Sequence, residues 1–452
     1  MRKNPCLHSL ANIVSQFLTP QVWKRAHQAW QAKHAPSRWK LQALVWVLLT
    51  MAWGLGDSIE ERFVTARAAY VAHHLKARRP GQSLAGFLHA LAQLPMPALR
   101  TLNACLREQF TESFVDAARI HGWAPFACDG TRLLCPRSAE LQKHLGTGAK
   151  EASAPMLFLT ALVLLPLGLP WAWHWGKGAA DEHRHLRQLL PTLPPRSLLV
   201  LDAAYPSYDL YQRLQAMDMA FLVRVSSRSI FYTLDDDRRT EPQQLPRLRD
   251  RLVYYWPKKT AQDKKQLPLV VRLIRVCGKH GDVWLATNIM DPDQLSRKMA
   301  GHVYRWRWRN EGLFRQYKHL LHKVKIASRS VRLVHREAEG AMLALQLVLA
   351  HAATRTQSGH GTVMVMDSPR RMLLIIRSSI TAALSRLGPR QLASYQFLLA
   401  QVRAEQRPRT SRRTRQIWPR RRDHKPPKPP QVRVMSDKLK AKRQRVFAAA
   451  RH

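Results

Sequence analysis

The sequence predicts an α/β protein in which a sheet-forming core follows a helical N-terminal region. Residues 8–115 carry apolar side chains at helical spacing, whereas from about residue 122 short apolar runs of strand length alternate with helical segments. Two acids stand in or directly after such runs, at Asp129 and Asp202. Farther along, residues 304–318 form a basic segment of helical period with one carboxylate, Glu311.

The N-terminal region, residues 1–118, is expected to consist of helices joined by short basic loops. Apolar periodicity predicts them at 8–18, 20–33, 37–54, 58–76, 83–93 and 97–111. The pair Pro80-Gly81 and the prolines at 95 and 97 separate the later segments.

The first part of the core, residues 119–225, is expected to alternate strands and helices. The first strand lies in "WAPFACDGTRLL" and contains Asp129-Gly130, and the fourth, 197–201, ends on Asp202. The other expected elements are strands at 156–163, 169–175 and 219–225 and helices at 181–191 and 207–217. The order β-β-β-α-β-α-β, with acids on the first and fourth strands, is the layout of a ribonuclease H-like fold.

The rest of the chain divides into three parts. Residues 226–300 contain short alternating strands with charged joins, which indicates a β-rich insertion. Residues 301–400 complete the core with the basic helix and with helices at 332–354 and 369–400. Residues 401–452 are rich in Pro and Arg with little to bury, so a disordered basic tail is expected.

The charge of the chain points to a polyanionic partner. The 452 residues include 74 Lys or Arg against 30 Asp or Glu, a net charge of +44. The tail contributes 18 basic residues and three acids, so the remaining 400 residues are themselves strongly basic. Such an excess destabilises a compact chain unless a polyanion balances it, which makes nucleic acid the first candidate partner.

Several classes of protein fit the sequence poorly. The five cysteines are scattered without a CxxC pair, which argues against a zinc module and against a disulfide framework and fits the reducing cytoplasm. The first residues lack the apolar core of a signal peptide. The apolar run at 41–56 is too short to cross a membrane, and the run at 156–176 is broken by prolines and glycines. No membrane segment is expected.

The segment "YRWRWRNEGLFRQYK", residues 304–318, places four polar groups at helical spacing. Tyr304, Arg307, Glu311 and Lys318 are 3, 4 and 7 residues apart, so a continuous helix presents all four on one face. Burying that face would cost several kcal/mol unless each group were paired. Two interpretations are open: a solvated charged face with ordinary i,i+4 pairs, or a functional site.

The acids favour the second interpretation. A single Asp at a strand end is more often a turn cap than a ligand. Asp129 and Asp202, however, stand on strands that we expect to be neighbours, and adjacent carboxylates repel one another unless a cation lies between them. With Glu311 from a helix on the same sheet edge, three carboxylates converge. Oxygen ligands of this kind suit Mg²⁺ or Mn²⁺, and two such ions can catalyse phosphoryl transfer.

At these residues the sequence resembles a known family. Asp129-Gly130, the segment "LDAAY" at 201–205, and Tyr304-x2-Arg307-x3-Glu311-x6-Lys318 resemble the DDE transposases of bacterial insertion sequences. The most similar branch is the insertion-sequence-four family, whose Tyr-Arg-Glu-Lys signature is matched at all four positions. The resemblance covers about residues 120–345. The chain departs from the pattern at Ala203-Ala204, where Arg-Gly is common, and this leaves the turn geometry open.

The resemblance implies roles for the individual residues. Asp129, Asp202 and Glu311 would bind two Mg²⁺ ions, with Mn²⁺ as a substitute. Three further residues, Tyr304, Arg307 and Lys318, would hold DNA phosphates beside the scissile bond. Trp284 matches the position at which the family stacks a flipped-out base on a tryptophan; the alternative for Trp284 is a core residue of a strand.

The function implied is that of a transposase. It would cut the ends of its element with water and join the freed 3′-OH to target double-stranded DNA, as a homodimer in the bacterial cytoplasm, associated with the nucleoid. The N-terminal region either packs the core or binds a DNA end. Two other functions stay open: a catalytically inactive DNA-binding protein derived from a transposase, and a nuclease without strand joining. If Glu311 is not the third acid, Glu337 and Glu339 are the next candidates.

Overall fold

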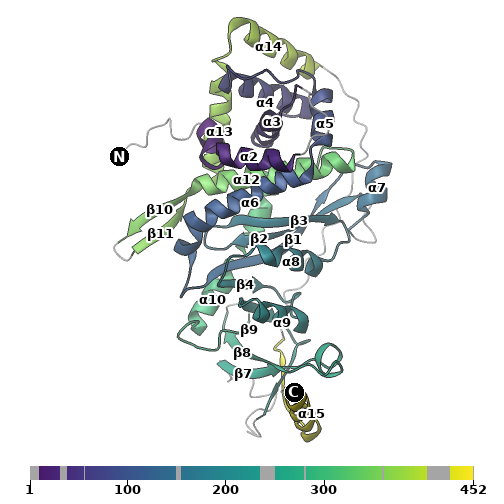
Figure 1. Cartoon of the computed structure of the whole chain (residues 1–452), viewed down its shortest axis with the longest axis vertical. Coiled ribbons are helices and arrows are strands. Elements are labelled where there is room, and N and C mark those ends of the chain that lie inside the picture. The colour runs from purple at the N-terminus through teal and green to yellow at the C-terminus, as the bar shows by residue number, and fades with distance from the viewer. Residues whose placement is uncertain are drawn as a thin grey trace.

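The computed structural model describes residues 10–30, 38–54, 56–148, 154–234, 250–278, 281–358, 361–404 and 428–450. These residues form a large mixed sheet with helices on both faces and a helical region at one end (Figure 1). The predicted α/β class is confirmed.

The N-terminal helices lie close to their predicted positions. They are α1 (Leu10–Phe17), α2 (Pro20–Ala29), α3 (Leu41–Trp53), α4 (Ile59–His73), α5 (Leu84–Gln93) and α6 (Met96–Phe110). Side-chain caps set two of the starts, because Ser58 and Ser83 accept hydrogen bonds from backbone N–H groups in the first turns of α4 and α5. Helix α3 is buried almost throughout, as its largely apolar sequence requires.

The sheet contains the five core strands in the order β3-β2-β1-β4-β5. Their bounds are β1 (Ala124–Leu134), β2 (Met156–Leu164), β3 (Leu169–Lys177), β4 (Ser197–Leu201) and β5 (Ala220–Val225). The first three are antiparallel, whereas β4 pairs parallel with both β1 and β5. The parallel connections are made by α8 (Glu182–Leu189) and α9 (Tyr208–Ala216), both at predicted places. One helix, α7 (Ala139–Leu145), was not predicted.

The expected β-rich insertion extends the same sheet. Its strands are β6 (Ile230–Thr233), β7 (Asp250–Tyr255), β8 (Leu269–Val276) and β9 (Val283–Thr287), and β9 pairs antiparallel with β5. The insertion therefore continues the hydrogen-bonded ladder of the core on the side away from β3.

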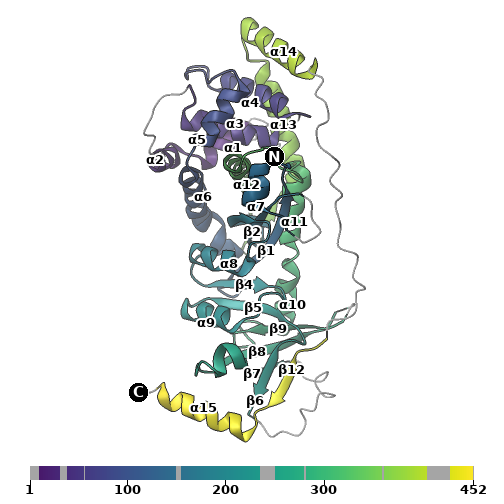
Figure 2. The same ribbon diagram turned by 90° about the vertical axis from the view of Figure 1, so that its right-hand side faces the viewer.

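Different helices cover the two faces of the sheet. Helices α8 and α9 lie on one face, and α10 (Arg297–Trp306) and α11 (Arg309–Arg315) lie on the other (Figure 2). Successive residues of β1 and β4 therefore belong to different hydrophobic clusters. Cys128 and Leu199 belong to one cluster. Ala127 and Val200 belong to the other, which includes Tyr304 of α10.

The long helix α12 (Val331–Ala352) joins the helical region to the sheet. The Trp53 indole of α3 donates a hydrogen bond to the carbonyl of Ala344 at 3.0 Å. At Gly340 the two helices approach so closely that an added Cβ would lie 2.5 Å from Leu48 of α3. The N-terminal region is thus packed on the core, as one of the two predicted roles requires.

The segment expected as one helix over 369–400 is two helices. They are α13 (Pro369–Leu384) and α14 (Pro389–Ala404), and the break falls at Gly388-Pro389, where proline cannot continue a helix. Before them, α12 ends in a hairpin of β10 (Ala353–Ser358) and β11 (Gly361–Met366), which was not predicted.

The prediction of a disordered tail is wrong for residues 428–450. Strand β12 (Gln431–Val434) pairs parallel with β6 at the edge of the sheet, and α15 (Asp437–Ala449) follows it (Figure 2). The few apolar residues of the tail explain this order, because Val432, Met435 and Val446 are buried. Residues 405–427, the Arg-rich stretch of the tail, lie outside the described part of the chain.

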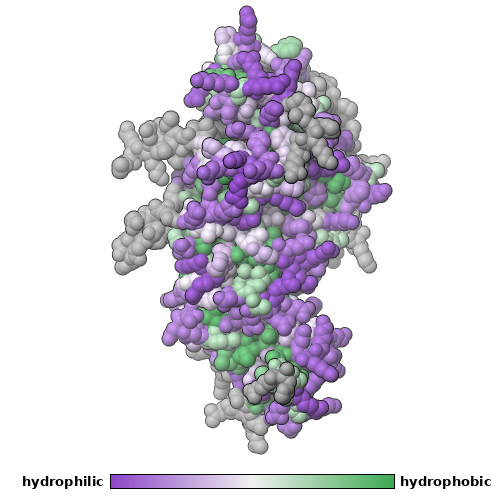
Figure 3. Space-filling model, in the orientation of Figure 1, coloured by the Kyte–Doolittle hydropathy of each residue, from purple (hydrophilic) through white to green (hydrophobic). Residues whose placement is uncertain are grey.

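None of the described helices is long and apolar enough to cross a membrane. On the face drawn in Figure 3, hydrophilic residues cover most of the surface. This surface agrees with the high charge of the sequence.

Candidate active site

Asp129 lies in β1 and Asp202 directly follows β4, the neighbouring parallel strand. Ala127 of β1 is paired with Val200 of β4, and each Asp follows its paired residue by two positions. Because side chains alternate along a strand, both carboxylates point to the face that Ala127 and Val200 share. That face is the one covered by α10 and α11. Neighbouring strands are about 4.8 Å apart, so this register brings the two acids together.

Both acids also hold local backbone. An oxygen of Asp129 accepts a hydrogen bond from the N–H of Gly130 at 2.8 Å, and one of Asp202 accepts from the N–H of Ala204 at 2.8 Å. The hydrogen bond from Ala204 to Asp202 closes the turn after β4, so the turn forms with Ala203-Ala204 where Arg-Gly is common. The second carboxylate oxygen of Asp129 faces Arg307, whereas that of Asp202 is left for another partner.

The basic segment does not form one continuous helix. Helix α10 ends at Trp306, α11 begins at Arg309, and a π-helical turn (Gln316–Leu320) follows. The residues at the break, Arg307 and Trp308, keep right-handed helical backbone angles, so the segment continues in the same direction. Within it, Tyr304 and Arg307 are buried, Lys318 is half-buried and Glu311 is exposed.

Despite the break, side chains of this segment lie beside Asp129 and its neighbour Thr131 on β1. The Arg307 guanidinium lies 3.6 Å from the carboxylate of Asp129 and 5.8 Å from the ring centre of Tyr304. The Lys318 ammonium donates a hydrogen bond to the hydroxyl of Thr131 at 2.7 Å, two residues along β1 from Asp129. Burial lowers the pKa of Lys318, as it does for a cation withdrawn from water.

The electrostatics of Asp129 link the three predicted acids. Its pKa is raised, first by burial and then by the negative charges of Asp202 and Glu311, while the Gly130 N–H and Arg307 act against the rise. Asp129 therefore experiences both other acids as nearby like charges.

A fourth acid, Glu182, was missed by the sequence reasoning. Its carboxyl at the start of α8 approaches β1 from the opposite face of the sheet. A Cβ added at Gly130 would lie 2.7 Å from Glu182 Oε1, so a glycine is required there for the approach. Burial, with added repulsion from Asp129 and Asp202, raises the pKa of Glu182 to about 7, and Oε1 has no hydrogen-bond partner among the residues that the structure describes. The signal in the sequence was the Gly after Asp129, together with the acid that opens "EHRHLRQL".

The other candidates lie elsewhere. Trp284 of β9 is 5% exposed and belongs to the hydrophobic core, which matches the alternative of a core residue and leaves no ring face for a base in this structure. Glu337 accepts hydrogen bonds from Lys323 and from the N–H groups of Ala327 and Ser328. Glu339 accepts from the indoles of Trp173 and Trp175. The carboxylates of both glutamates are therefore engaged in hydrogen bonds inside the fold.

The predicted ligands Asp129, Asp202 and Glu311 are carboxylates, which Mg²⁺ and Mn²⁺ prefer. Glu182 approaches β1 from the other face of the sheet, so it does not belong to this set of ligands. In chemistry these residues fit a divalent ion. In arrangement, no three His, Cys, Asp or Glu side chains of the described chain are grouped to hold one, and Arg307 supplies the positive charge beside Asp129.

Comparison with known families assigns the region that contains this site. Residues 126–347 match the family model of the transposase DDE domain. The matched region begins in β1, three residues before Asp129, and ends within α12, so it includes all the predicted site residues. No curated protein matches the chain.

Proposed function

We propose that the protein is a transposase that cuts the DNA ends of an insertion sequence and joins them to target DNA. The DDE domain supports the general activity. The finer assignment, a ribonuclease H-like core of the insertion-sequence-four branch, rests on the strand order 3-2-1-4-5 and on the Tyr304, Arg307, Glu311 and Lys318 spacing.

One observation carries the proposal. Asp129 of β1 and Asp202 directly after β4 each lie two residues beyond the paired residues Ala127 and Val200, and Asp129 is close enough to Asp202 and Glu311 to be affected by their charges. A mere DNA-binding protein has no need of acids at this point, because like charges and a polyanionic ligand all repel one another there. The cost of placing them together is explained by a cation that they share.

In this proposal Asp129, Asp202 and Glu311 hold two Mg²⁺ ions, or Mn²⁺ in their place. When bound, such ions activate a nucleophile and stabilise the leaving oxygen of a phosphodiester. Asp202 keeps its turn closed through Ala204 and so fixes one carboxylate relative to β4. Arg307 balances Asp129 in the free protein, and it would be available to a DNA phosphate if a divalent ion were held by that carboxylate.

The surrounding residues guide the DNA. Lys318 is held by Thr131 close to Asp129, and we assign it and Arg307 to phosphates next to the scissile bond. Tyr304 is buried against the sheet, so we assign it to positioning Arg307, whose guanidinium lies by its ring. The helical region of residues 1–118 then contacts the DNA end outside the DDE domain, in a homodimer that bridges two ends at the bacterial nucleoid.

One experiment separates the transposase from its rivals. The purified protein is incubated with labelled element ends, a supercoiled target and Mg²⁺. A transposase yields nicked ends and joined product, a nuclease yields nicks alone, and an inactive descendant yields a shifted complex only. Either of the last two results, obtained with the correct ends, would overturn the proposal.

A further inference from the structure

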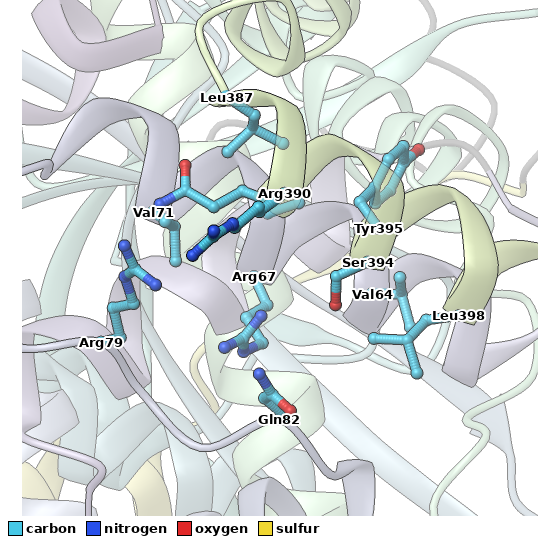
Figure 4. A pocket seen from close by; sticks show the side chains of 12 residues that line it. Val64, Arg67, Val71, Arg79, Gln82, Leu387, Arg390, Ser394, Tyr395 and Leu398 are labelled. Carbon is cyan, nitrogen blue, oxygen red and sulfur yellow. The ribbon is translucent and has the colours of Figure 1, made fainter.

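A cavity of about 240 Å³ lies outside the DDE domain, between α4, the loop that follows it and α14 (Figure 4). Its walls come from segments more than 300 residues apart in the sequence. The lining residues are Val64, Arg67, Ala68, Val71, Arg79, Gln82, Leu387, Arg390, Gln391, Ser394, Tyr395 and Leu398.

Three guanidinium groups dominate the polar part of the lining. Arg67 comes from α4, Arg79 from the loop and Arg390 from α14, and Figure 4 shows them around one space. Among the described residues that line the cavity there is no carboxylate. The remaining polar lining side chains, Gln82, Gln391, Ser394 and Tyr395, are uncharged donors and acceptors.

Arg67 is held in place within the fold. Its side chain donates hydrogen bonds to the carbonyls of Gly81 at 2.8 Å and Pro80 at 3.2 Å, which ties it to the loop that carries Arg79. Burial lowers the pKa of Arg67, and the positive charge of Arg79 lowers it further. The two cations therefore lie close enough to repel each other, and an anion between them would remove that repulsion.

The shape and chemistry select the ligand. The cavity is smaller than the roughly 300–1,000 Å³ of pockets for drug-sized molecules, so it suits a compact group. Guanidinium groups match the oxygens of phosphate through paired N–H donors. We propose that this pocket binds a phosphate group through Arg67, Arg79 and Arg390.

Two sources can supply such a group: a phosphodiester of DNA or free inorganic phosphate. The high positive charge of the chain favours DNA, and this choice rests on the proposed function. The pocket lies in the helical region, at the opposite end of the molecule from α15 (Figure 2). It would give the DNA a second point of attachment, remote from the aspartates.

The test uses the double variant Arg79→Gln/Arg390→Gln in the full-length protein. Both side chains are exposed, so the fold should be retained, which thermal unfolding checks. The matched control is Arg78→Gln/Arg386→Gln, two exposed arginines of the same loop and of the turn before α14 that do not line the cavity. The control removes the same charge from the same region.

Binding is measured by fluorescence anisotropy with a DNA duplex at several salt concentrations, and by thermal shift with inorganic phosphate. If a backbone phosphate is held, the slope of log affinity against log salt should become shallower by about 0.9 for the lost contact, beyond any change in the control. If free phosphate is the ligand, phosphate should stabilise the parent and the control but not the double variant, with DNA binding equal in all.

The proposal is overturned if the double variant and the control behave alike in both assays. Nicking of element ends with Mg²⁺ is scored separately. If the parent protein does not nick element ends but its pocket still binds phosphate, the proposed function is refuted and the phosphate site is retained. If the parent nicks element ends but the pocket substitutions change neither binding assay, the phosphate site is refuted and the proposed function is retained.

Discussion

The guanidinium of Arg307 stands 3.6 Å from the carboxylate of Asp129, and both side chains are largely buried. Asp129 is therefore balanced by a cation from the chain itself in the absence of metal. The arginine and a divalent ion need the same carboxylate, so binding of one weakens binding of the other. This competition makes the first prediction.

Replacing Arg307 by Gln should increase the affinity for Mg²⁺ and reduce nicking. The affinity for Mg²⁺ should rise because no arginine then competes for the carboxylate of Asp129. Nicking should fall because the variant lacks the proposed contact to a DNA phosphate. Mg²⁺ titration followed by thermal shift measures the first effect without any turnover. Arg305→Gln, an exposed neighbour in α10, is the control. An unchanged Mg²⁺ midpoint in the Arg307 variant would refute the competition.

The substitutions Asp129→Asn, Asp202→Asn and Glu311→Gln should each abolish nicking and leave binding of element ends within a few-fold. Loss of a metal ligand removes transition-state stabilisation, whereas affinity comes from phosphate contacts elsewhere. Gel shifts and strand-cleavage assays measure the two quantities. Asp209→Asn, an exposed acid of α9, should retain both. Cleavage by Glu311→Gln at the parent rate would mean that Glu311 is not the third acid.

Glu182 should make stability fall as the pH rises. Its pKa is raised from the ordinary 4.5 to about 7, so the carboxyl favours folding most below pH 4.5 and loses that contribution as the pH passes 7. The raised pKa of Asp129 acts in the same direction. In metal-free buffer the midpoint of thermal unfolding should therefore decline between pH 5 and 8.

In Glu182→Gln this decline should be clearly shallower, because a neutral amide replaces the titrating group. The control is Asp209→Asn, for which the midpoint of thermal unfolding should fall with pH as steeply as in the parent protein. If the slopes of Glu182→Gln and the parent coincide, Glu182 is not the group that titrates.

Trp284 should behave as a core residue. Removing its ring in Trp284→Ala should lower the free energy of unfolding by roughly 3–5 kcal/mol through the cavity left behind. Activity should fall in parallel with folding, and Trp284→Phe should recover most of both. Denaturant unfolding and end cleavage are measured on the same samples. A stable Trp284→Ala protein whose cleavage is rescued by an abasic DNA end would instead show that the ring stacks on a base.

Much of the fold follows from local patterns in the sequence. The strand 197–201 was predicted to the residue, because four successive apolar residues after Ser197 end at an acid, which is typical of a buried strand. The parallel pairing of β1, which carries Asp129, with β4, which precedes Asp202, agrees with the expectation that these strands are neighbours. These features depend on short stretches whose side chains determine burial directly.

Other features depend on contacts between distant segments. The break between Trp306 and Arg309 leaves the helical period intact, so periodicity does not reveal it. The approach of Glu182 depends on the absence of a side chain at Gly130, on another element. Strand β12 forms because the edge of β6, two hundred residues earlier, offers unpaired backbone groups, and composition alone carries no information about that partner.

The position of β12 also determines the order in which the protein is completed during translation. Strand β6 emerges from the ribosome early, yet its partner on this edge is among the last segments synthesised. Until residues 431–434 appear, the nascent chain displays an open strand edge that can pair with another copy. A frameshift or early stop after α14 would therefore release chains that contain Asp129, Asp202 and Glu311 but leave the edge of β6 unpaired and able to pair with another chain. Ribosome-released fragments ending near residue 404 should aggregate, while the full-length chain should not.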